Sequence, residues 1–324
     1  MASLKFNNVY LNDWHILAGP LESNSKLKRI DLKMNDYYFG EKTFEQAEVK
    51  MQRLVIDNII EKNKLTYNNI DLIVGGDLLD QISATNYACS NIPISLLGVY
   101  SACATFPETL IIGSMSLQEK NLKKVIGVTS SHNLTAERQF RYPIEYGSPK
   151  PHTSTFTSTA SVSTLLSKDV GKVKIDSVTI GKVVEFGVTD ANNMGAVMAP
   201  AAAQTLHEHL EELKRELNYY DLILTGDLGC VGSEIFHEYC NQSYNLKLKR
   251  HLDAGCELYL KSQETYSGGS GPACLPLVLF GKIIPTNKYK KILIIGTGAL
   301  LSKTFTNQKN AIPAIAHAVS LEVL

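Results

Sequence analysis

Cys103 is the residue whose type and position best suit a nucleophile. It stands just before segment 106–119, which has a helical pattern, and Pro107 fits such a helix only in its first turn, where a missing N–H is not needed. The helix is therefore expected to begin near Cys103, where free N–H groups and the positive end of the helix dipole favour a thiolate. A small buried cysteine between a strand and a helix explains the same position equally well.

A glycine-rich segment, residues 267–278, is the second candidate for chemistry. It contains three glycines around Ser270, namely Gly268, Gly269 and Gly271. Glycines let a backbone approach a ligand closely and can present N–H groups to an anion or a carbonyl oxygen. The segment is a weak signal by itself, and it would gain weight if it faced Cys103 across a pseudo-two-fold axis.

A third dense segment, residues 130–147, follows an expected strand that ends near Thr129. Loops after the carboxyl ends of parallel strands hold the sites of many α/β proteins. His132 comes directly after the strand end, and we therefore expect it in a pocket.

The same segment contains Arg138 and Arg141, which could hold carboxylates in bidentate pairs. Their acidic neighbours Glu137 and Glu145 offer another interpretation, in which the four charges pair with one another and brace a loop or a dimer contact. We favour ion pairing for the arginines, because structural ion networks are common.

The elements that must position these residues form an internal repeat. Residues 71–78, Asp-Leu-Ile-Val-Gly-Gly-Asp-Leu, recur at 221–228 as Asp-Leu-Ile-Leu-Thr-Gly-Asp-Leu, and 123–128 is echoed by 290–296. Each match is a short apolar run that predicts a buried strand. The matches keep their order and are offset by 150 and 167 residues, which indicates duplication with a 17-residue insertion in the second half.

A helix is expected before each Gly-Asp strand. Thr43 and Gln46 have the spacing of a capping box in front of an amphipathic run. The counterpart in the second half begins near Ala201, with leucines on one stripe. Apolar strands that alternate with helices indicate sheets covered on both faces.

Two such halves predict an α/β fold of five layers, an α-β-α-β-α sandwich. No linker of low complexity divides the chain. We therefore expect one domain, residues 1–324, with an N-terminal half of about 1–185 and a C-terminal half of about 186–324.

Composition excludes several classes of protein. The chain has 32 Lys+Arg and 32 Asp+Glu, so its bulk charge attracts neither nucleic acid nor an acidic membrane. No stretch approaches the roughly 20 apolar residues of a membrane span, and the N-terminus lacks the pattern of a secretory signal. Six cysteines stand singly, and His207 and His209 are two apart on a helix and do not face each other. We expect no metal site, no cofactor and synthesis in a reducing cytoplasm.

The motifs together resemble the thiolase and ketoacyl-synthase superfamily. They are a strand that leads to Cys103 at a helix start, a second glycine-rich helix start, and a final strand that ends in Gly296-Thr297-Gly298. The resemblance implies a thiolase-like fold, and it implies that Cys103 matches the acyl-accepting nucleophile.

A closer similarity, over nearly the whole chain, is to the stage V sporulation protein AD family. The residues that carry it are 76–79, 130–147, 198–203, 225–228, 268–271 and 297–302. The string 130–147 is far more specific than a short motif.

The chain departs from the condensing enzymes at two positions. On this matching, the usual His falls at Gly226 or Asp227 and the usual Asn at Gly269. Loss of one oxyanion donor costs about 10²–10³ in rate, so the resemblance implies that the chain is not a condensing enzyme. Cys103 becomes a vestigial nucleophile that could still be acylated but lacks its expected base.

Proteins similar to this one help to move dipicolinic acid into the developing spore and are implicated in binding it. The resemblance implies a pocket for this pyridine dicarboxylate. Its expected residues are Cys103, His132, Asp227 and Gly268–Gly271, with Arg138 or Arg141 as carboxylate partners. Asp227 would repel a free dianion, and the sequence leaves open whether it pairs with the ring nitrogen through a proton or meets calcium that arrives with the ligand.

The resemblance also implies partners and a location. We expect a homodimer through the sheet of the Cys103 half, and attachment to the spore inner membrane through other stage V sporulation A membrane proteins. Two other functions remain: a docking subunit with a vestigial pocket, and an acyl-transfer enzyme in which His132 serves Cys103 as base. We rank the binding protein first, then the docking subunit, then the enzyme, and the first two are compatible.

Overall fold

Two copies of one run of elements build the molecule, as the internal repeat predicts. The computed structural model describes residues 2–140 and 150–324. The first copy is β2 (Tyr10–Ala18), α1 (Phe44–Lys62), β4 (Leu72–Gly76), α2 (Ser83–Cys89), β5 (Ser95–Gly98), α3 (Thr105–Ser116), β6 (Lys124–Ser131) and β8 (Ala160–Ser167). The second copy is β9 (Val173–Ile180), α5 (Met194–Leu213), β10 (Leu222–Thr225), α6 (Gly229–Tyr244), β11 (His251–Asp253), α8 (Cys274–Val278), β13 (Lys291–Ala299) and β14 (Ala314–Val323). The second copy thus starts with β9 at Val173, somewhat before the border of about residue 185 expected from sequence.

The strands of each copy follow the same spatial order. The first half runs β5-β4-β6-β8-β2 and the second β11-β10-β13-β14-β9, so corresponding strands take corresponding places. Four of the pairs are parallel (β4 with β5 and β6, β10 with β11 and β13), and the pairs that involve β8 or β14 are antiparallel. The halves join where β2 meets β9. Short strands β1 (Ala2–Lys5) and β3 (Leu32–Lys33) pair with β9 and β2.

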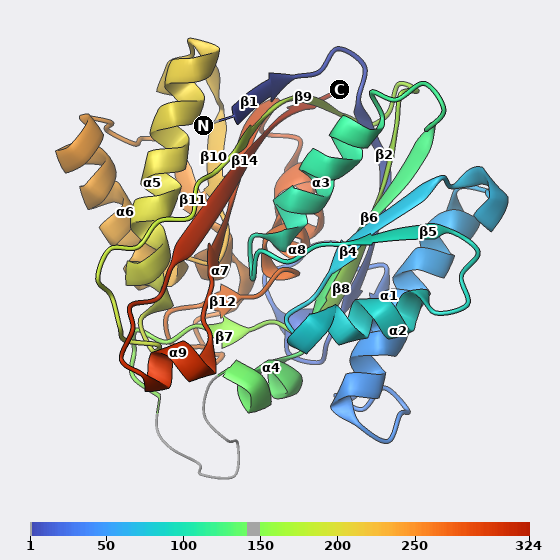
Figure 1. Ribbon diagram of the computed structural model, residues 1–324, viewed down its shortest axis with the longest axis horizontal. Coiled ribbons are helices and arrows are strands. Elements are labelled where there is room, and N and C mark those ends of the chain that lie inside the picture. Colours follow the sequence, from blue (N-terminus) through green and yellow to red (C-terminus); the bar gives the residue numbers. More distant parts are fainter. Residues whose placement is uncertain (1, 141–149) are drawn as a thin grey trace.

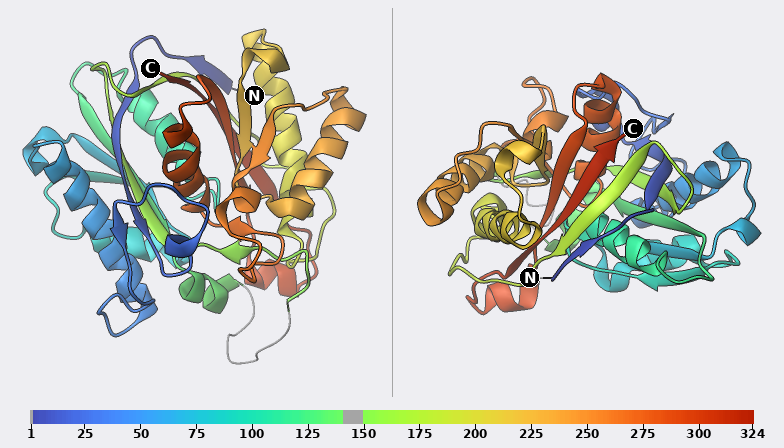
Figure 2. Two further views of the ribbon diagram at one scale, coloured as in Figure 1. Left: turned by 180° about the vertical axis from the view of Figure 1, so that it is seen from behind. Right: turned by 90° about the horizontal axis from the view of Figure 1, so that it is seen from above.

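Helices cover and separate the two half-sheets, which gives the five layers expected from sequence. Figures 1 and 2 show α3 and α8 between the half-sheets, with α1 and α2 outside one and α5 and α6 outside the other. The largest apolar cluster lies around α3 and α8, and two others lie under α1 and under α5. This thiolase-like arrangement confirms the predicted fold class. None of the helices in the described part is long and apolar enough to cross a membrane.

The repeat extends to individual hydrogen bonds. Asp71 Oδ2 accepts from the backbone N–H groups of residues 123–124 at 2.7 and 2.8 Å. Asp221 Oδ2 accepts from residues 290–291, both at 2.9 Å. The aspartate at the head of each repeated strand therefore pins the next parallel strand in the same way in both halves.

Helix starts agree with the sequence in one half and differ in the other. Thr43 caps α1, and its Oγ1 accepts from the Gln46 N–H at 3.2 Å, as predicted. The counterpart, α5, begins at Met194 and not near Ala201, because Asn193 caps it. Pro200 lies inside this helix. An internal proline opposes helix, so the pattern alone favoured a later start.

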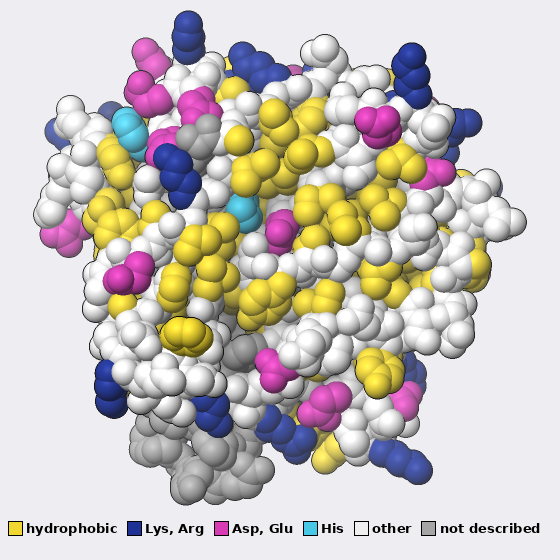
Figure 3. Space-filling view, viewed as in Figure 1, with side chains coloured by type: hydrophobic (Ala, Val, Ile, Leu, Met, Phe, Trp, Pro, Cys, Tyr) yellow, Lys and Arg dark blue, Asp and Glu magenta, His cyan; other side chains and the backbone are white. Residues whose placement is uncertain are grey.

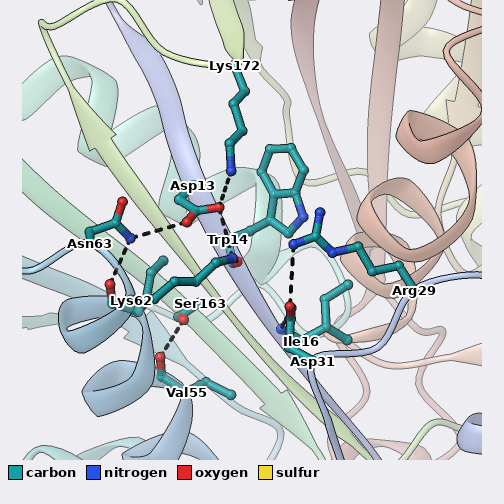
Figure 4. Close-up of polar contacts among 11 residues, drawn as sticks. Asp13, Trp14, Ile16, Arg29, Asp31, Val55, Lys62, Asn63, Ser163 and Lys172 are labelled. Carbon is teal, nitrogen blue, oxygen red and sulfur yellow. Dashed lines mark hydrogen bonds and ion pairs between the residues drawn. The ribbon is translucent and has the colours of Figure 1, made fainter.

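A buried aspartate ties the first half to the start of the second (Figure 4). Asp13 in β2 accepts hydrogen bonds from Lys62 Nζ at the end of α1 (3.0 Å) and from Lys172 Nζ just before β9 (2.5 Å). Burial alone would raise the pKa of Asp13, but the hydrogen bonds from Lys172 and Lys62 hold it below its ordinary value.

Candidate active site

A pocket lies between the halves, in front of the N-terminus of α3. It is lined by Leu78, Tyr100, Ala102, Cys103, Ala136, Thr155, Thr157, Met194, Met198, Ser270, Ala299 and Leu301. It encloses about 500 Å³, including its open mouth. Its walls are apolar, with a few polar groups.

Cys103 reaches this pocket from a turn at the start of α3. The helix begins at Thr105, so Pro107 is its third residue and lies in the first turn, as predicted. Ala102 has a φ of 51°, a left-handed conformation that is uncommon for a residue with a Cβ and is found at functional turns. The thiol is partly exposed and lines the pocket.

The Gly-x-Gly sequence of β13 allows this turn to pack. A Cβ on Gly298 would lie 2.2 Å from the Ser101 carbonyl oxygen, and one on Gly296 would lie 2.2 Å from Pro107 Cγ. Only glycine permits so close an approach. The motif therefore seats the Cys103 turn of one half against the sheet of the other half.

The duplicated Gly-Asp motif gives its two aspartates different surroundings. Asp77, after β4, accepts from the N–H groups of Leu79 and Thr85, both at 2.8 Å, and from the Thr85 hydroxyl. Asp227, after β10, is fully buried with a φ of 70°, and neither carboxyl oxygen has a hydrogen-bond partner among the described residues. Asp77 thus stabilises the loop that follows its strand, whereas Asp227 makes no such hydrogen bonds to the described residues.

In the second half, Asp253 makes the hydrogen bonds to the loop that Asp77 makes in the first half. This aspartate at the end of β11 accepts from the N–H groups of Leu228 (3.2 Å) and Gly229 (3.0 Å) and from the Thr225 hydroxyl. It therefore supports the loop after β10 from a neighbouring strand. Burial, and then the charge of Asp253, raise the pKa of Asp227 well above its ordinary value. The Cys274 thiol and the Gly271 N–H lower the pKa of Asp227, but their effects are smaller than that of burial.

His132 is not available to a ligand, contrary to the expectation from sequence. The ring is fully buried; its Nε2 lies 2.8 Å from the Tyr37 carbonyl oxygen, and its Nδ1 accepts from the Leu134 N–H at 3.2 Å. Both nitrogens are therefore engaged, and Nε2 carries the proton. Burial lowers the pKa of the ring to about 4. His132 holds the segment before α1 against the start of α4 (Asn133–Phe140) and cannot serve Cys103 as base.

Arg138 and Glu137 each form an ion pair, but not with each other. Arg138 pairs with Glu45 of α1 at 3.4 Å on the surface, and Glu137 pairs with Lys150 at 2.7 Å. Arg138 does not line the pocket. Arg141 lies outside the described residues.

Only part of the glycine segment meets the pocket. Ser270, in the short strand β12 (Gly269–Ser270), lines it, and its Oγ accepts from the Thr155 hydroxyl at 3.1 Å. The N–H of Gly268 is committed to the Thr265 carbonyl oxygen, so it cannot cap a ligand carboxylate. Gly269 pairs in register with Phe156 of β7 (Phe156–Thr157). Gly271 is a neighbour of Asp227, and neither residue lines the pocket.

Sequence reasoning missed the residues that form most of the walls. Thr155 and Thr157 lie on and beside β7, and Met194 and Met198 on the first turns of α5. Alternate threonines on a two-residue strand give almost no signal in a sequence. The methionines would have required the true start of α5.

The polar groups suit an anion or a polar ring but provide no fixed cation. Among the described lining residues the polar side chains are one thiol, three hydroxyls and the Tyr100 phenol, and none is Lys or Arg. Positive potential comes instead from the N-terminal ends of α3 and α5, both of which open on the pocket. The described residues contain no cluster of three or more groups able to hold a metal ion.

Comparisons with known proteins support one family and one fold. The family model of stage V sporulation protein AD matches residues 2–322. Stage V sporulation protein AD of Bacillus subtilis (strain 168) is 39% identical over 318 residues, which cover 97% of this chain and 94% of the relative. Among solved structures, OleA from Xanthomonas campestris has a TM-score of 0.61 at 13% identity and covers 98% of this chain and 99% of its own. The 3-oxoacyl-[acyl-carrier-protein] synthase III of Aquifex aeolicus VF5 has a TM-score of 0.53 at 11% identity, with 97% of each chain covered.

Proposed function

The chain belongs to the stage V sporulation protein AD family, and we propose that it binds dipicolinic acid, free or as its calcium chelate, in the pocket that Cys103 lines. The observation that carries this proposal is Asp227, a fully buried carboxyl group without a hydrogen-bond partner among the described residues. Asp227 does not line the pocket, so the ligand must displace part of the wall to reach it. A buried polar group left without a partner costs about 1–3 kcal/mol, so its retention favours a role in contact with a ligand.

The raised pKa of Asp227 weakens the main objection to a dianionic ligand. Because burial favours the protonated carboxyl group, Asp227 opposes the ligand carboxylates less than an ordinary aspartate would. Its O–H can donate to a carboxylate oxygen or to the pyridine nitrogen, and such a hydrogen bond to a charged acceptor is among the stronger ones. A neutral acid is a poor calcium ligand, so any calcium would be held chiefly by the dipicolinate itself.

The rest of the pocket offers hydroxyls and apolar walls. Thr157 and Ser270 provide hydroxyls for the second carboxylate, and the hydroxyl of Thr155, which donates to Ser270, orients the latter. The positive ends of α3 and α5 add favourable potential. The flexible side chains of Met194 and Met198 can cover the ring faces. Since Met194 and Met198 form part of the wall, we expect them to move when the ligand enters.

We propose that the chain does not catalyse condensation. His132 is held by Tyr37 and Leu134, and Asp227 lies outside the pocket lining with its pKa raised by burial, so we assign neither as a base for Cys103. The resemblance places the His of condensing enzymes at Gly226 or Asp227 and their Asn at Gly269. Cys103 then serves as a contact for the ligand and not as a nucleophile.

We extend the proposal to the cell, where the bound dipicolinate would be passed into the developing spore and remain relevant to germination. The partners would be the other stage V sporulation A membrane proteins at the spore inner membrane. A homodimer would form at β5, which is the edge strand of the sheet. The side chain of Leu97 in this strand is 46% exposed, and that of the nearby Tyr100 is 42% exposed. Figure 3 shows hydrophobic side chains gathered on the face that contains β5 and α3.

The test is calorimetric titration of dipicolinate, with and without calcium, into the protein and its variants. Asp227→Ala should weaken binding about 10- to 100-fold, the equivalent of one lost hydrogen bond to a charged group. Asp227→Asn keeps an N–H donor and should retain affinity within a few-fold. Circular dichroism establishes that each variant is folded.

Arg138→Ala is the matched control, because Arg138 pairs with Glu45 outside the pocket and its loss should leave the affinity unchanged. Saturable binding that Asp227→Ala does not weaken would reject this pocket. No heat with folded protein would favour the docking subunit. Stable acylation of Cys103 by an acyl-CoA would instead favour the enzyme.

A further inference from the structure

Two cysteines outside the pocket lie side by side. Cys230 is the second residue of α6 and is exposed, and Cys256, in the short helix α7 (Ala254–Leu258), is partly buried. The two side chains are close enough to affect each other's pKa, and they are not joined in a disulfide. The dipicolinate proposal uses neither of them.

The backbone holds the two cysteines close together. A Cβ on Gly255 would lie 3.3 Å from the Cα of Gly229, so the residues that precede the two cysteines are in direct contact. Asp253 Oδ1 accepts from the N–H groups of Gly229 (3.0 Å) and Cys256 (3.3 Å), which ties both helix starts to one carboxyl group. A disulfide needs a Cα separation of about 4.4–6.8 Å, and contact between the preceding residues favours such a separation for the two cysteines.

The surroundings make the two thiols unequal. The interaction with Cys256 lowers the pKa of Cys230, and the charge of Lys26 lowers it further. Burial and the charge of Asp253 raise it, but by less. Lys26 Nζ is fixed nearby, because it donates to the Cys256 carbonyl oxygen at 2.9 Å. The first turn of the 16-residue α6 adds its positive end. The interaction with Cys230 and then burial raise the pKa of Cys256.

We propose that Cys230 and Cys256 form a thiol–disulfide exchange site for low-molecular-weight disulfides of the glutathione type. The Cys230 thiolate attacks one sulfur of the disulfide RSSR, forms a mixed disulfide and releases RS⁻, which takes up a proton. Cys256 then loses its proton to solvent, attacks the Cys230 sulfur and releases the second RS⁻. The balance is one protein dithiol and one RSSR converted to one protein disulfide and two RSH.

This division of roles follows from exposure and acidity. The attacking thiol must be accessible and should be the more acidic of the two, which describes Cys230, and the resolving thiol needs only to be adjacent. The new bond would link α6 to α7 directly behind β12, since a Cβ on Gly255 would lie 2.4 Å from the Gly269 carbonyl oxygen.

The test uses oxidised glutathione as the probe on the full chain. After alkylation of the remaining thiols and proteolysis, mass spectrometry should find a Cys230–Cys256 cross-link in the wild type. Cys256→Ser should stop at one glutathione bound to Cys230, and Cys230→Ser should lose both the cross-link and that adduct. Cys240→Ala, which changes a buried thiol on the same helix, should leave the cross-link intact.

The proposal is wrong if the folded wild-type protein accumulates glutathione on Cys230 without forming the cross-link. It is equally wrong if Cys256→Ser leaves Cys230 unmodified while the Cys240→Ala control cross-links normally. Neither result depends on dipicolinate binding, so this site and the pocket are tested separately.

Discussion

Glu22 offers a quantitative test of how strongly the interior keeps carboxyl groups neutral, which is the physical basis for the role of Asp227. The side chain is fully buried. Its Oε1 accepts from the Thr159 N–H at 3.1 Å and from the Tyr259 hydroxyl, and its Oε2 has no partner among the described residues. Burial raises the pKa of Glu22 from its ordinary 4.5 to about 7.

The sign follows from proton counting. Between pH 4.5 and about 7 the folded state holds the Glu22 proton and the unfolded state has lost it, so the free energy of unfolding falls as the pH rises. Each pKa unit is equivalent to 1.36 kcal/mol, so the full loss is about 3 kcal/mol above pH ~8.

Glu22→Gln removes this titration and keeps the oxygen that accepts from Thr159 and Tyr259. The assay is urea unfolding of both proteins at about pH 5 and pH 8.5. The free energy of unfolding of the variant, relative to wild type, should rise by about 2.5 kcal/mol between these conditions. Other buried acids such as Asp253 titrate in both proteins and cancel. The exposed Glu119→Gln is the matched control and should give no pH-dependent difference. An equal difference between Glu22→Gln and wild type at both pH values would refute the reasoning.

Three further predictions concern folding, each measured by urea unfolding. Thr43→Ala removes the cap of α1 and should lower the free energy of unfolding by about 1 kcal/mol. Thr43→Ser keeps a hydroxyl at this position and should retain most of the wild-type stability. Gly271→Ala should lower the free energy of unfolding by well over 1 kcal/mol, because φ is 103° and the new Cβ would lie 2.6 Å from a serine hydroxyl. The control Gly187→Ala, at φ 77° in open space, should lower it clearly less. Equal losses would contradict the role of the contact. Asp13→Ala leaves two lysines without their partner and should lower the free energy of unfolding by about 2–3 kcal/mol at pH 7. This difference from wild type should shrink as the pH falls below ~4, because the wild-type carboxyl group is then protonated.

The sequence predicted those features that depend on local pattern. The two apolar runs that end in Gly-Asp became β4 and β10, and the placement of Pro107 in a first turn correctly located the start of α3 beside Cys103. These signals work because strand burial and the geometry of proline are properties of short segments.

The sequence could not predict features that depend on partners distant in the chain. His132 is engaged by Tyr37, which lies 95 residues away, and Arg138 by Glu45, which lies 93 residues away. The special status of Asp227 is invisible in its own motif, because Asp77 has the same neighbours in sequence and a purely structural role. Only the fold shows that Asp253 has taken over the capping role in the second half.

The most direct test of dipicolinate binding at Cys103 is the rate at which iodoacetamide alkylates individual cysteines, with and without saturating dipicolinate. Cys103 lines the pocket, whereas Cys230 is exposed elsewhere and serves as an internal control. A ligand that occupies the pocket should slow alkylation of Cys103 by about tenfold or more while Cys230 reacts at the same rate, and Asp227→Ala should abolish the protection at the same ligand concentration. Equal alkylation of Cys103 with and without dipicolinate, at a concentration that saturates binding, would contradict the account.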